Sequence, residues 1–228
     1  MSAGDTQGEQ RYSEAAQIAY RSGAIAILRA PRADRFAAVA EALVAAGITA
    51  LEFTLTSEGA VDALAQCAGR MPDHVALGAG TVLDAEAADA CIDAGARFLV
   101  TPCVTPDVVA RAWEREVPTF PGALTPTEVL AAWRSGAAGV KLFPAAAVGP
   151  AYIGQIAGPL PDVPLVPTGG VRIEDAGAWI RAGAAAVGVG GPLIGDAATD
   201  GSLRSLEERA RRLVDAIAEA RQEQPLTV

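Results

Sequence analysis

The chain has 228 residues, of which 51% are hydrophobic and 20% charged, and its formal net charge is −9 with a pI near 4.7. This acidic balance, without any block rich in lysine or arginine, excludes bulk binding to nucleic acid or to an anionic membrane, because both need many cations against phosphates. The three cysteines, Cys67, Cys91 and Cys103, are scattered without metal-ligand spacing and suit a reducing compartment.

The first ten residues, M-S-A-G-D-T-Q-G-E-Q, contain neither the basic region nor the apolar region of a signal peptide. No run of about 18 apolar residues predicts a membrane span. We therefore expect a soluble, cytoplasmic protein with no membrane partner. Residues 1–10 and 223–228 are predicted to be disordered tails on either side of one domain, 11–222.

Short apolar runs alternate with alanine-rich segments of helical period along the whole chain. The runs are continuously apolar, which is typical of parallel strands covered on both faces. Successive runs begin roughly 20 to 26 residues apart, which is the length of one strand and one helix. The predicted strands are 24–28, 48–53, 75–78, 97–100, 117–120, 139–143, 164–167 and 186–189.

The helical segments complete the predicted fold. Residues 11–22 predict an extra N-terminal helix, and 202–221 predict a terminal one. Eight evenly spaced strand–helix units favour an α/β fold, a single-domain (β/α)8 TIM barrel, with a doubly wound open sheet as the alternative. Four helices are predicted to end at a glycine that precedes the next strand: Gly47, Gly95, Gly136 and Gly183.

Lys141, in the stretch G-V-K-L-F-P, is the only lysine in the chain, whereas the other 17 basic residues are arginines. A guanidinium stays protonated, so only a lysine can supply an amine that attacks a carbonyl. On a strand, the side chains of Lys141 and Phe143 lie on one face. The apolar interior of a barrel favours an uncharged amine, and we therefore interpret Lys141 as a nucleophile.

Glu52, at the end of the second predicted strand, is a lone carboxylate among Leu51, Phe53 and Leu55. A carboxyl group in such apolar surroundings can act as a proton shuttle. We therefore predict that Glu52 works together with Lys141. The alternative is structural: a buried ion pair between the two residues, or a lysine whose amine extends to solvent.

Other polar residues follow predicted strands, where a barrel places its chemistry. Arg29, after the first strand, can clamp a carboxylate or a phosphate, or pair with Glu52 instead. Thr81, after the third strand, can donate to a carboxylate, or cap the helix that begins near Asp84. Cys103 follows the fourth strand, and we expect it to be a packing residue.

Glycine-rich segments follow the seventh and eighth strands, T-G-G at 168–170 and G-G at 190–191. Their backbone N–H groups can bind a phosphate, although tight turns would also explain them. The single histidine, His74, precedes the third strand and is expected at the surface. With no acidic cluster beside it, no metal and no other cofactor are predicted, and an iminium on Lys141 would serve as the electron sink.

Several of these stretches, in this order and spacing, resemble one known family over roughly residues 15–220. They are A-I-L-R-A, L-E-F-T, G-A-G-T-V, T-P-C-V-T-P, P-G-A-L-T-P-T-E, V-K-L-F-P, V-G-P-x-Y-I, V-P-T-G-G-V and G-V-G-G. The chain resembles the class I 2-keto-3-deoxy-6-phosphogluconate (KDPG) aldolases, which also act on 4-hydroxy-2-oxoglutarate. The resemblance implies cleavage of KDPG to pyruvate and glyceraldehyde 3-phosphate, and of 4-hydroxy-2-oxoglutarate to pyruvate and glyoxylate.

The resemblance also implies a homotrimer, a small-molecule 2-oxo acid as substrate, and a role for each matching residue. Lys141 matches the Schiff-base lysine, and Glu52 matches the general acid/base. The residues that match substrate-binding positions are Arg29, Thr81, Pro102, Phe143, Thr168, Gly169, Gly170, Gly190 and Gly191.

The chain departs from the family pattern at two positions. Some members carry arginine where Thr56 stands, and many carry serine where Gly191 stands, so Arg29 and backbone amides would hold the anions here. Relatives specific for the galactonate epimer resemble the chain in V-G-P-x-Y-I but often have an apolar residue in place of Thr168, which favours the gluconate substrate. A galactonate aldolase, a non-covalent phosphate-binding barrel isomerase or synthase, and a non-catalytic sugar-phosphate binder are the alternatives.

Overall fold

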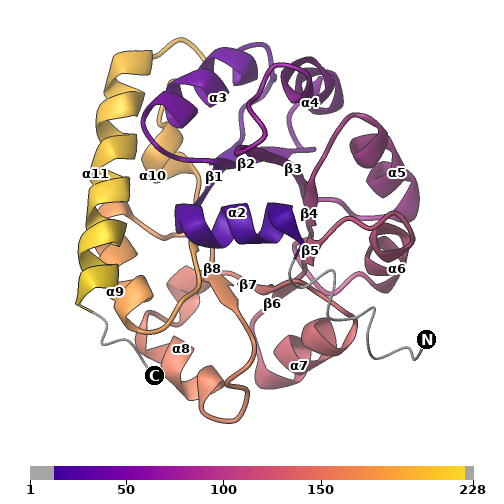
Figure 1. Cartoon of the computed structure of the whole chain (residues 1–228), viewed down its shortest axis with the longest axis vertical. Coiled ribbons are helices and arrows are strands. Elements are labelled where there is room, and N and C mark those ends of the chain that lie inside the picture. The colour runs from indigo at the N-terminus through magenta and orange to yellow at the C-terminus, as the bar shows by residue number, and fades with distance from the viewer. Residues whose placement is uncertain (1–12, 224–228) are drawn as a thin grey trace.

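The computed structural model of the chain describes residues 13–223. It is an α/β fold in which short parallel strands lie at the centre and helices surround them (Figure 1). The strands are β1 (Ala24–Leu28), β2 (Ala50–Thr54), β3 (Ala76–Gly80), β4 (Phe98–Val100), β5 (Thr119–Phe120), β6 (Gly122–Ala123), β7 (Val140–Leu142), β8 (Leu165–Pro167) and β9 (Val187–Val189).

The strands form a six-stranded sheet in the order β5-β4-β3-β2-β1-β9 and a three-stranded sheet in the order β6-β7-β8. Pro121 alone separates β5 from β6, and proline lacks the N–H that a continuous ladder needs. A parallel bridge joins Thr168, the residue after β8, to Gly188 in the middle of β9. The first strand neighbours the last and the order never reverses, so the doubly wound alternative is wrong.

A helix or helical turn follows nearly every strand, and long α11 runs along one side of the molecule (Figure 1). The α-helices are α2 (Glu14–Ser22), α3 (Phe36–Ala45), α4 (Ala60–Ala68), α5 (Ala85–Asp93), α6 (Pro106–Glu114), α7 (Pro126–Arg134), α8 (Ala151–Ala157), α9 (Ala176–Arg181), α10 (Gly191–Ile194) and α11 (Leu203–Gln222), with 3-10 turns η1 (Ala145–Ala147) and η2 (Ile173–Asp175).

The predicted helix ends are confirmed at all four glycines. Their φ angles are +98° at Gly47, +97° at Gly95, +95° at Gly136 and +104° at Gly183. This left-handed conformation ends a helix and is open to glycine without the steric cost that a Cβ atom adds. Each glycine thus directs the chain from a helix into the following strand.

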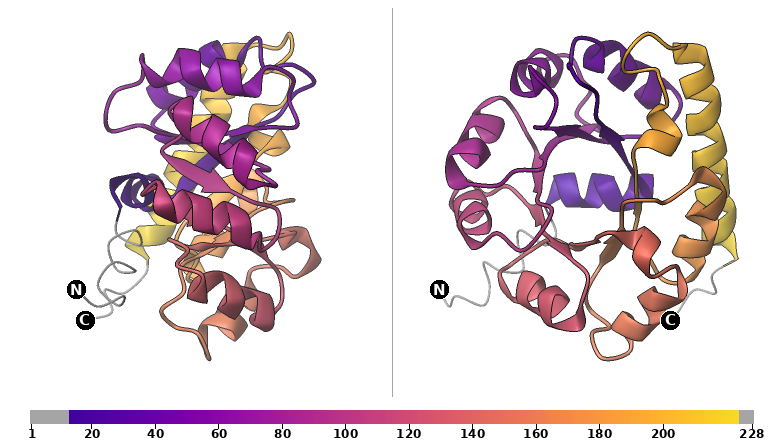
Figure 2. Two further views of the ribbon diagram at one scale, coloured as in Figure 1. Left: turned by 90° about the vertical axis from the view of Figure 1, so that its right-hand side faces the viewer. Right: turned by 180° about the vertical axis from the view of Figure 1, so that it is seen from behind.

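Helix α2 crosses the ring of strands at the end where the strands begin, as the two opposite views show (Figures 1 and 2). Its buried residues Ala16 and Ala19 are fully enclosed and pack with Phe98, Phe120 and Val166 in one apolar cluster. Removing these apolar surfaces from water stabilises the helix in place. The N-terminal ends of the strands are therefore covered, and the C-terminal ends are left for a site.

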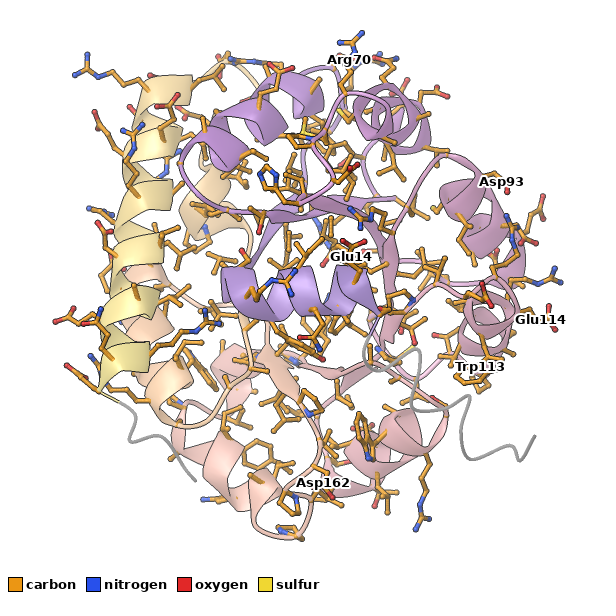
Figure 3. All side chains as sticks on the ribbon, viewed as in Figure 1. Glu14, Arg70, Asp93, Trp113, Glu114 and Asp162 are labelled. Carbon is orange, nitrogen blue, oxygen red and sulfur yellow. The ribbon has the colours of Figure 1, made fainter. Side chains whose placement is uncertain are left out.

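Two polar contacts hold α2 in this position. The hydroxyl of Tyr20 donates to the carbonyl of Ala138 at 2.6 Å, and burial raises the pKa of Tyr20 well above its ordinary value, so that it remains a donor. Glu14, which begins the helix (Figure 3), pairs with Arg97 at 2.8 Å. Helix α2 therefore has a side-chain contact with the strands or their connections near each of its ends.

The predicted tails, 1–10 and 223–228, lie outside the described residues except for Glu223, as do the first two residues of the predicted helix 11–22. Between residues 13 and 223, none of the helices has both the length and the apolar character to cross a membrane.

Candidate active site

Lys141 lies in β7, between Gly122 of β6 and Val166 of β8 in the strand register. Its side chain is buried, with 7% of the residue exposed, whereas its neighbours Val140 and Leu142 belong to the core cluster under the helices. The amine Nζ lies 5.2 Å from the centroid of the Phe143 ring. The prediction that Lys141 and Phe143 share a face is therefore confirmed.

A cavity of about 190 Å³ contains this lysine at the C-terminal ends of β1, β7, β8 and β9. The structure brings eight of the residues singled out in the sequence into its wall: Arg29, Lys141, Phe143, Thr168, Gly169, Gly170, Gly190 and Gly191. Three further residues complete the wall, and sequence reasoning missed them: Ile27, Val171 and Pro192. The residues predicted to lie in or after the first, sixth, seventh and eighth strands, which are β1, β7, β8 and β9 in the structure, therefore line one cavity.

Glu52 lies in β2, one strand away from this wall, with Ile27 of β1 as its register partner. Only 2% of the residue is exposed, and its Oε1 atom is buried without a hydrogen-bond partner among the described residues. A buried acceptor left unpaired costs about 1–3 kcal/mol. Such exceptions are concentrated at functional sites, so Glu52 is a candidate for proton transfer.

The two ion-pair alternatives, Lys141 with Glu52 and Arg29 with Glu52, are wrong. No ion pair within the described part of the chain includes Glu52, Lys141 or Arg29. Arg29 is exposed, and its guanidinium donates to the hydroxyl of Thr81 at 3.5 Å. An exposed guanidinium at the rim of the cavity is free to bind an anion with its remaining donors.

Thr81 does not cap the following helix. Asp84 caps α5 and accepts from the backbone N–H of Ala87 at 2.8 Å. Thr81 itself has a φ of +61°, in the left-handed region that residues other than glycine seldom adopt. A conformation of this kind often belongs to a functional site, and here it turns the Thr81 hydroxyl towards Arg29.

At two glycines, the backbone comes close to the side chains of Thr168 and Phe143 in the cavity wall. The hydroxyl of Thr168 donates to the carbonyl of Val166 at 3.1 Å, and a Cβ atom on Gly188 would lie 2.3 Å from that hydroxyl. A Cβ atom on Gly169 would lie 2.9 Å from the Phe143 ring. These glycines therefore let Thr168 and Phe143 approach the cavity.

Pro102 and Cys103 follow β4 and lie outside the cavity wall. The carbonyl of Pro102 packs on Gly122, where a Cβ atom would lie 2.2 Å from it, so Pro102 supports the strand beside Lys141. Cys103 is exposed, and the expectation that it is a packing residue is wrong. Strand β4 ends at Val100, and the chain then turns outwards to the surface.

His74 is exposed, as predicted. Within residues 13–223, no group of three or more histidine, cysteine, aspartate or glutamate side chains is arranged to hold a metal ion. The polar groups at the cavity are the Lys141 amine, the Arg29 guanidinium, the Thr168 hydroxyl and backbone amides.

A buried amine, a buried carboxylate oxygen and an exposed guanidinium at the C-terminal ends of parallel strands can supply a nucleophile for a carbonyl, a proton acceptor and an anion contact. The comparison with known proteins agrees. Residues 17–205 match the family model described as KDPG and KHG aldolase. The chain belongs to this family and is an aldolase, a carbon–carbon lyase.

Two curated relatives carry the names of different substrates. The chain is 41% identical over 138 residues to the 2-dehydro-3-deoxy-phosphogluconate aldolase of Pseudomonas aeruginosa, a match that covers 60% of this chain and 62% of that protein, less than two thirds of its length. It is 38% identical over 173 residues to the 2-dehydro-3-deoxy-6-phosphogalactonate aldolase of Escherichia coli, covering 74% of this chain and 83% of that protein.

Solved structures are also similar. A solved structure described as native KDPGal is 34% identical in sequence to this chain, with a TM-score of 0.82. The match covers 87% of this chain and 96% of the chain in that structure. The KDPG aldolase of Legionella pneumophila, with pyruvate captured as a covalent carbinolamine intermediate, is 27% identical with a TM-score of 0.76, and covers 90% of this chain and 98% of its own.

Proposed function

We propose that this protein is a class I aldolase that cleaves KDPG to pyruvate and glyceraldehyde 3-phosphate through a Schiff base on Lys141. The observation that carries the proposal is the burial of the only lysine in a cavity whose rim holds an exposed arginine. An amine enclosed in this way is a suitable nucleophile for a ketone. The carbinolamine captured in the Legionella pneumophila aldolase supports the same chemistry.

The reaction begins when Lys141 adds to the C2 ketone and water is lost, which gives a protonated iminium. The iminium draws electrons from the C3–C4 bond while the C4 hydroxyl loses its proton. Glyceraldehyde 3-phosphate leaves, and an enamine of pyruvate remains on the lysine. Protonation at C3 and hydrolysis then release pyruvate and regenerate the amine.

Glu52 is the proposed proton carrier, removing the C4 hydroxyl proton directly or through a water and returning a proton to C3. Its buried Oε1 has no hydrogen-bond partner within residues 13–223, which supports this role, because such an oxygen is available to accept a proton. Its register with Ile27, a residue of the cavity wall on the neighbouring strand, also supports this role.

The remaining predicted residues would bind the substrate. Arg29 and Thr81, joined by their hydrogen bond, would hold the carboxylate and so keep the ketone against the amine. Thr168 would contact the C4 hydroxyl, and Phe143 the carbon chain. The phosphate would meet backbone N–H groups of the two glycine-rich segments, 168–170 and 190–191. Pro102 would act from outside the wall, through Gly122.

The gluconate substrate is preferred over the galactonate epimer because Thr168, a hydroxyl-bearing residue, lines the cavity at the position proposed to contact C4. The galactonate aldolase of Escherichia coli is nevertheless similar over 74% of the chain. Cleavage of the galactonate epimer is therefore the second candidate function, and 4-hydroxy-2-oxoglutarate is proposed as a further substrate.

The test is a cleavage assay with purified protein on the two phosphorylated epimers and on 4-hydroxy-2-oxoglutarate, with released pyruvate measured enzymatically. We expect kcat/KM for the gluconate epimer to exceed that for the galactonate epimer at least tenfold, a difference of about 1.4 kcal/mol. The reverse order would assign the galactonate function. No pyruvate from any substrate would reject the aldolase and leave the phosphate-binding isomerase or the non-catalytic binder.

The wider architecture is part of the proposal. We propose a single-domain (β/α)8 barrel to which α2 is an N-terminal addition, supported by the adjacency of β1 and β9 and by the Thr168–Gly188 bridge. We also propose a cytoplasmic homotrimer, supported by family membership. Light scattering during size exclusion should give about three times the chain mass of 23.1 kDa.

A further inference from the structure

Two buried hydroxyl groups, one at the end of β2 and one in the turn that follows it, contact the backbone on both sides of Arg29. The Thr54 hydroxyl donates to the carbonyl of Leu28 at 3.0 Å, and the Ser57 hydroxyl accepts from the backbone N–H of Ala30 at 3.1 Å. Thr54 is 0% exposed and Ser57 is 2% exposed. Leu28 and Ala30 are separated in the chain by Arg29 alone.

The two hydroxyls also contact one another, with 3.5 Å between Thr54 Oγ1 and Ser57 Oγ. A hydroxyl has one proton to donate. Thr54 gives its proton to the Leu28 carbonyl, so Ser57 is the donor to Thr54. Hydrogen bonds therefore run in one direction, from the Ala30 N–H through Ser57 and Thr54 to the Leu28 carbonyl, and form a bridge around Arg29.

We infer that Thr54 and Ser57, the hydroxyl pair, are positioning residues that fix the backbone of Arg29 so that its guanidinium is preset for the substrate carboxylate. Arg29 has a long, exposed side chain whose only side-chain hydrogen bond within residues 13–223, to Thr81, is 3.5 Å long. The position of its guanidinium therefore depends mainly on the position of the Arg29 backbone. Groups that bind substrate need support of this kind from buried neighbours.

This inference rests on the proposed function, in which Arg29 binds the carboxylate. Neither hydroxyl lines the cavity, so the pair acts through Arg29 and not by touching substrate. A purely structural role, in which the hydroxyls only join β1 to β2, is the competing explanation. The two explanations differ in whether the loss of a hydroxyl changes the binding of a 2-oxo acid in protein that remains folded.

The experiment measures the pyruvate concentration that gives half-maximal trapping on Lys141 by borohydride, together with KM and kcat for cleavage. We expect Thr54→Val and Ser57→Ala each to raise the half-maximal concentration and KM about tenfold with little change in kcat or in trapping at saturation. Thr54→Ser, which keeps the hydroxyl, should restore the wild-type value. Unchanged half-maximal concentrations in folded Thr54→Val and Ser57→Ala would overturn the inference.

Ser22 provides a matched control at the opposite end of β1. Its hydroxyl donates to the carbonyl of Ala24 at 2.9 Å and accepts from the backbone N–H of Thr49 at 3.3 Å, so it also bridges β1 and the segment before β2. Ser22→Ala should lower the melting temperature, as Thr54→Val and Ser57→Ala also should, but it should leave pyruvate binding unchanged. An equal loss of pyruvate binding in Ser22→Ala would show that the effect is structural and overturn the inference.

A double-mutant comparison tests whether the pair acts through Arg29. In an Arg29→Ala background, Thr54→Val should cause no further loss of pyruvate binding, because the two changes remove one shared interaction. A full additional loss in that background would overturn the inference. Failure of the proposed function is a separate result, since the wild-type protein would then form no adduct on Lys141 at all.

Discussion

The carboxylate of Glu52 lies directly against the backbone of Gly80. A Cβ atom at residue 80 would lie only 1.8 Å from Glu52 Oε1. Gly80 ends β3 and is the register partner of Thr54, two residues after Glu52. The proposed proton carrier therefore has its place only because the neighbouring strand ends in a residue without a side chain.

Gly80→Ala should displace the Glu52 carboxylate and slow cleavage by about 10²-fold, which is within the usual contribution of a general acid or base. Trapping of pyruvate on Lys141 should persist, because the amine lies on a different strand. Gly154→Ala is the matched control, since a Cβ atom there meets nothing within 4 Å. Normal cleavage by folded Gly80→Ala would contradict the placement of Glu52.

Phe143 should stabilise the cation that forms on Lys141. The amine lies 5.2 Å from the ring centroid, and a cation over an aromatic face gains about 0.5–2 kcal/mol. Phe143→Leu should therefore reduce the equilibrium formation of the protonated iminium roughly twofold to thirtyfold, measured as adduct trapped at subsaturating pyruvate. Phe143→Tyr, which keeps a ring, should trap nearly normally. Equal trapping by wild type and Phe143→Leu would contradict this role.

The start of α7 should make stability depend on acid pH. Glu128 accepts from the backbone N–H groups of Thr125 and Leu124 at 2.8 and 2.9 Å, in a capping box with Thr125. These bonds, chiefly the one from Thr125, hold the pKa of Glu128 below its usual value. The stabilisation is thus present above the unfolded pKa, about 4.3, and is lost as the pH falls through the lower folded value.

Replacing Glu128 by glutamine should lower the free energy of unfolding by about 0.5–1 kcal/mol at pH 7, a small effect because the carboxylate is exposed. The difference from wild type should shrink as the pH falls below about 4.3, the unfolded value, and disappear once the pH is below the folded pKa of Glu128, in urea unfolding measured across this range. Glu208→Gln, which removes an exposed ion pair with Arg204, should change stability little at any pH. A difference for Glu128→Gln that persists unchanged in acid would contradict the cap.

The cysteines should differ in reactivity. Burial raises the pKa of the Cys91 thiol to about 11 and also raises that of Cys67, whereas Cys103 is exposed. Because the thiolate is the reactive form, an alkylating reagent at pH 8 should modify one cysteine in the folded protein and three in denaturant, counted by intact mass. Rapid labelling of two or more thiols without denaturant would contradict the described packing.

Much of the fold was predictable because its signals are local. Each predicted strand overlaps an observed one, and most boundaries agree within two residues, since continuous apolar runs and glycines that end helices are read directly from the sequence. The break at Pro121 was not predicted. Whether a proline interrupts a ladder depends on which N–H the neighbouring strand needs there.

The site was predictable where a residue stood out against its surroundings. Lys141 is the only lysine, and Glu52 is a carboxylate in an apolar run. The hydroxyl pair was missed because nothing local distinguishes Thr54 and Ser57 from other hydroxyl residues. Their contact with the backbone beside Arg29 depends on the register of β1 against β2, in which Leu28 is paired with Phe53.

The central claim is the iminium on Lys141, and it is tested by incubating the protein with pyruvate and sodium borohydride and recording its intact mass. The chain has one lysine, so a peptide digest need only separate Lys141 from the N-terminal amine. We predict one stable pyruvate-derived adduct on Lys141, and none in Lys141→Arg, which keeps the charge but should lose essentially all cleavage. Folded wild-type protein without an adduct on Lys141, or substantial turnover by Lys141→Arg, would contradict the account.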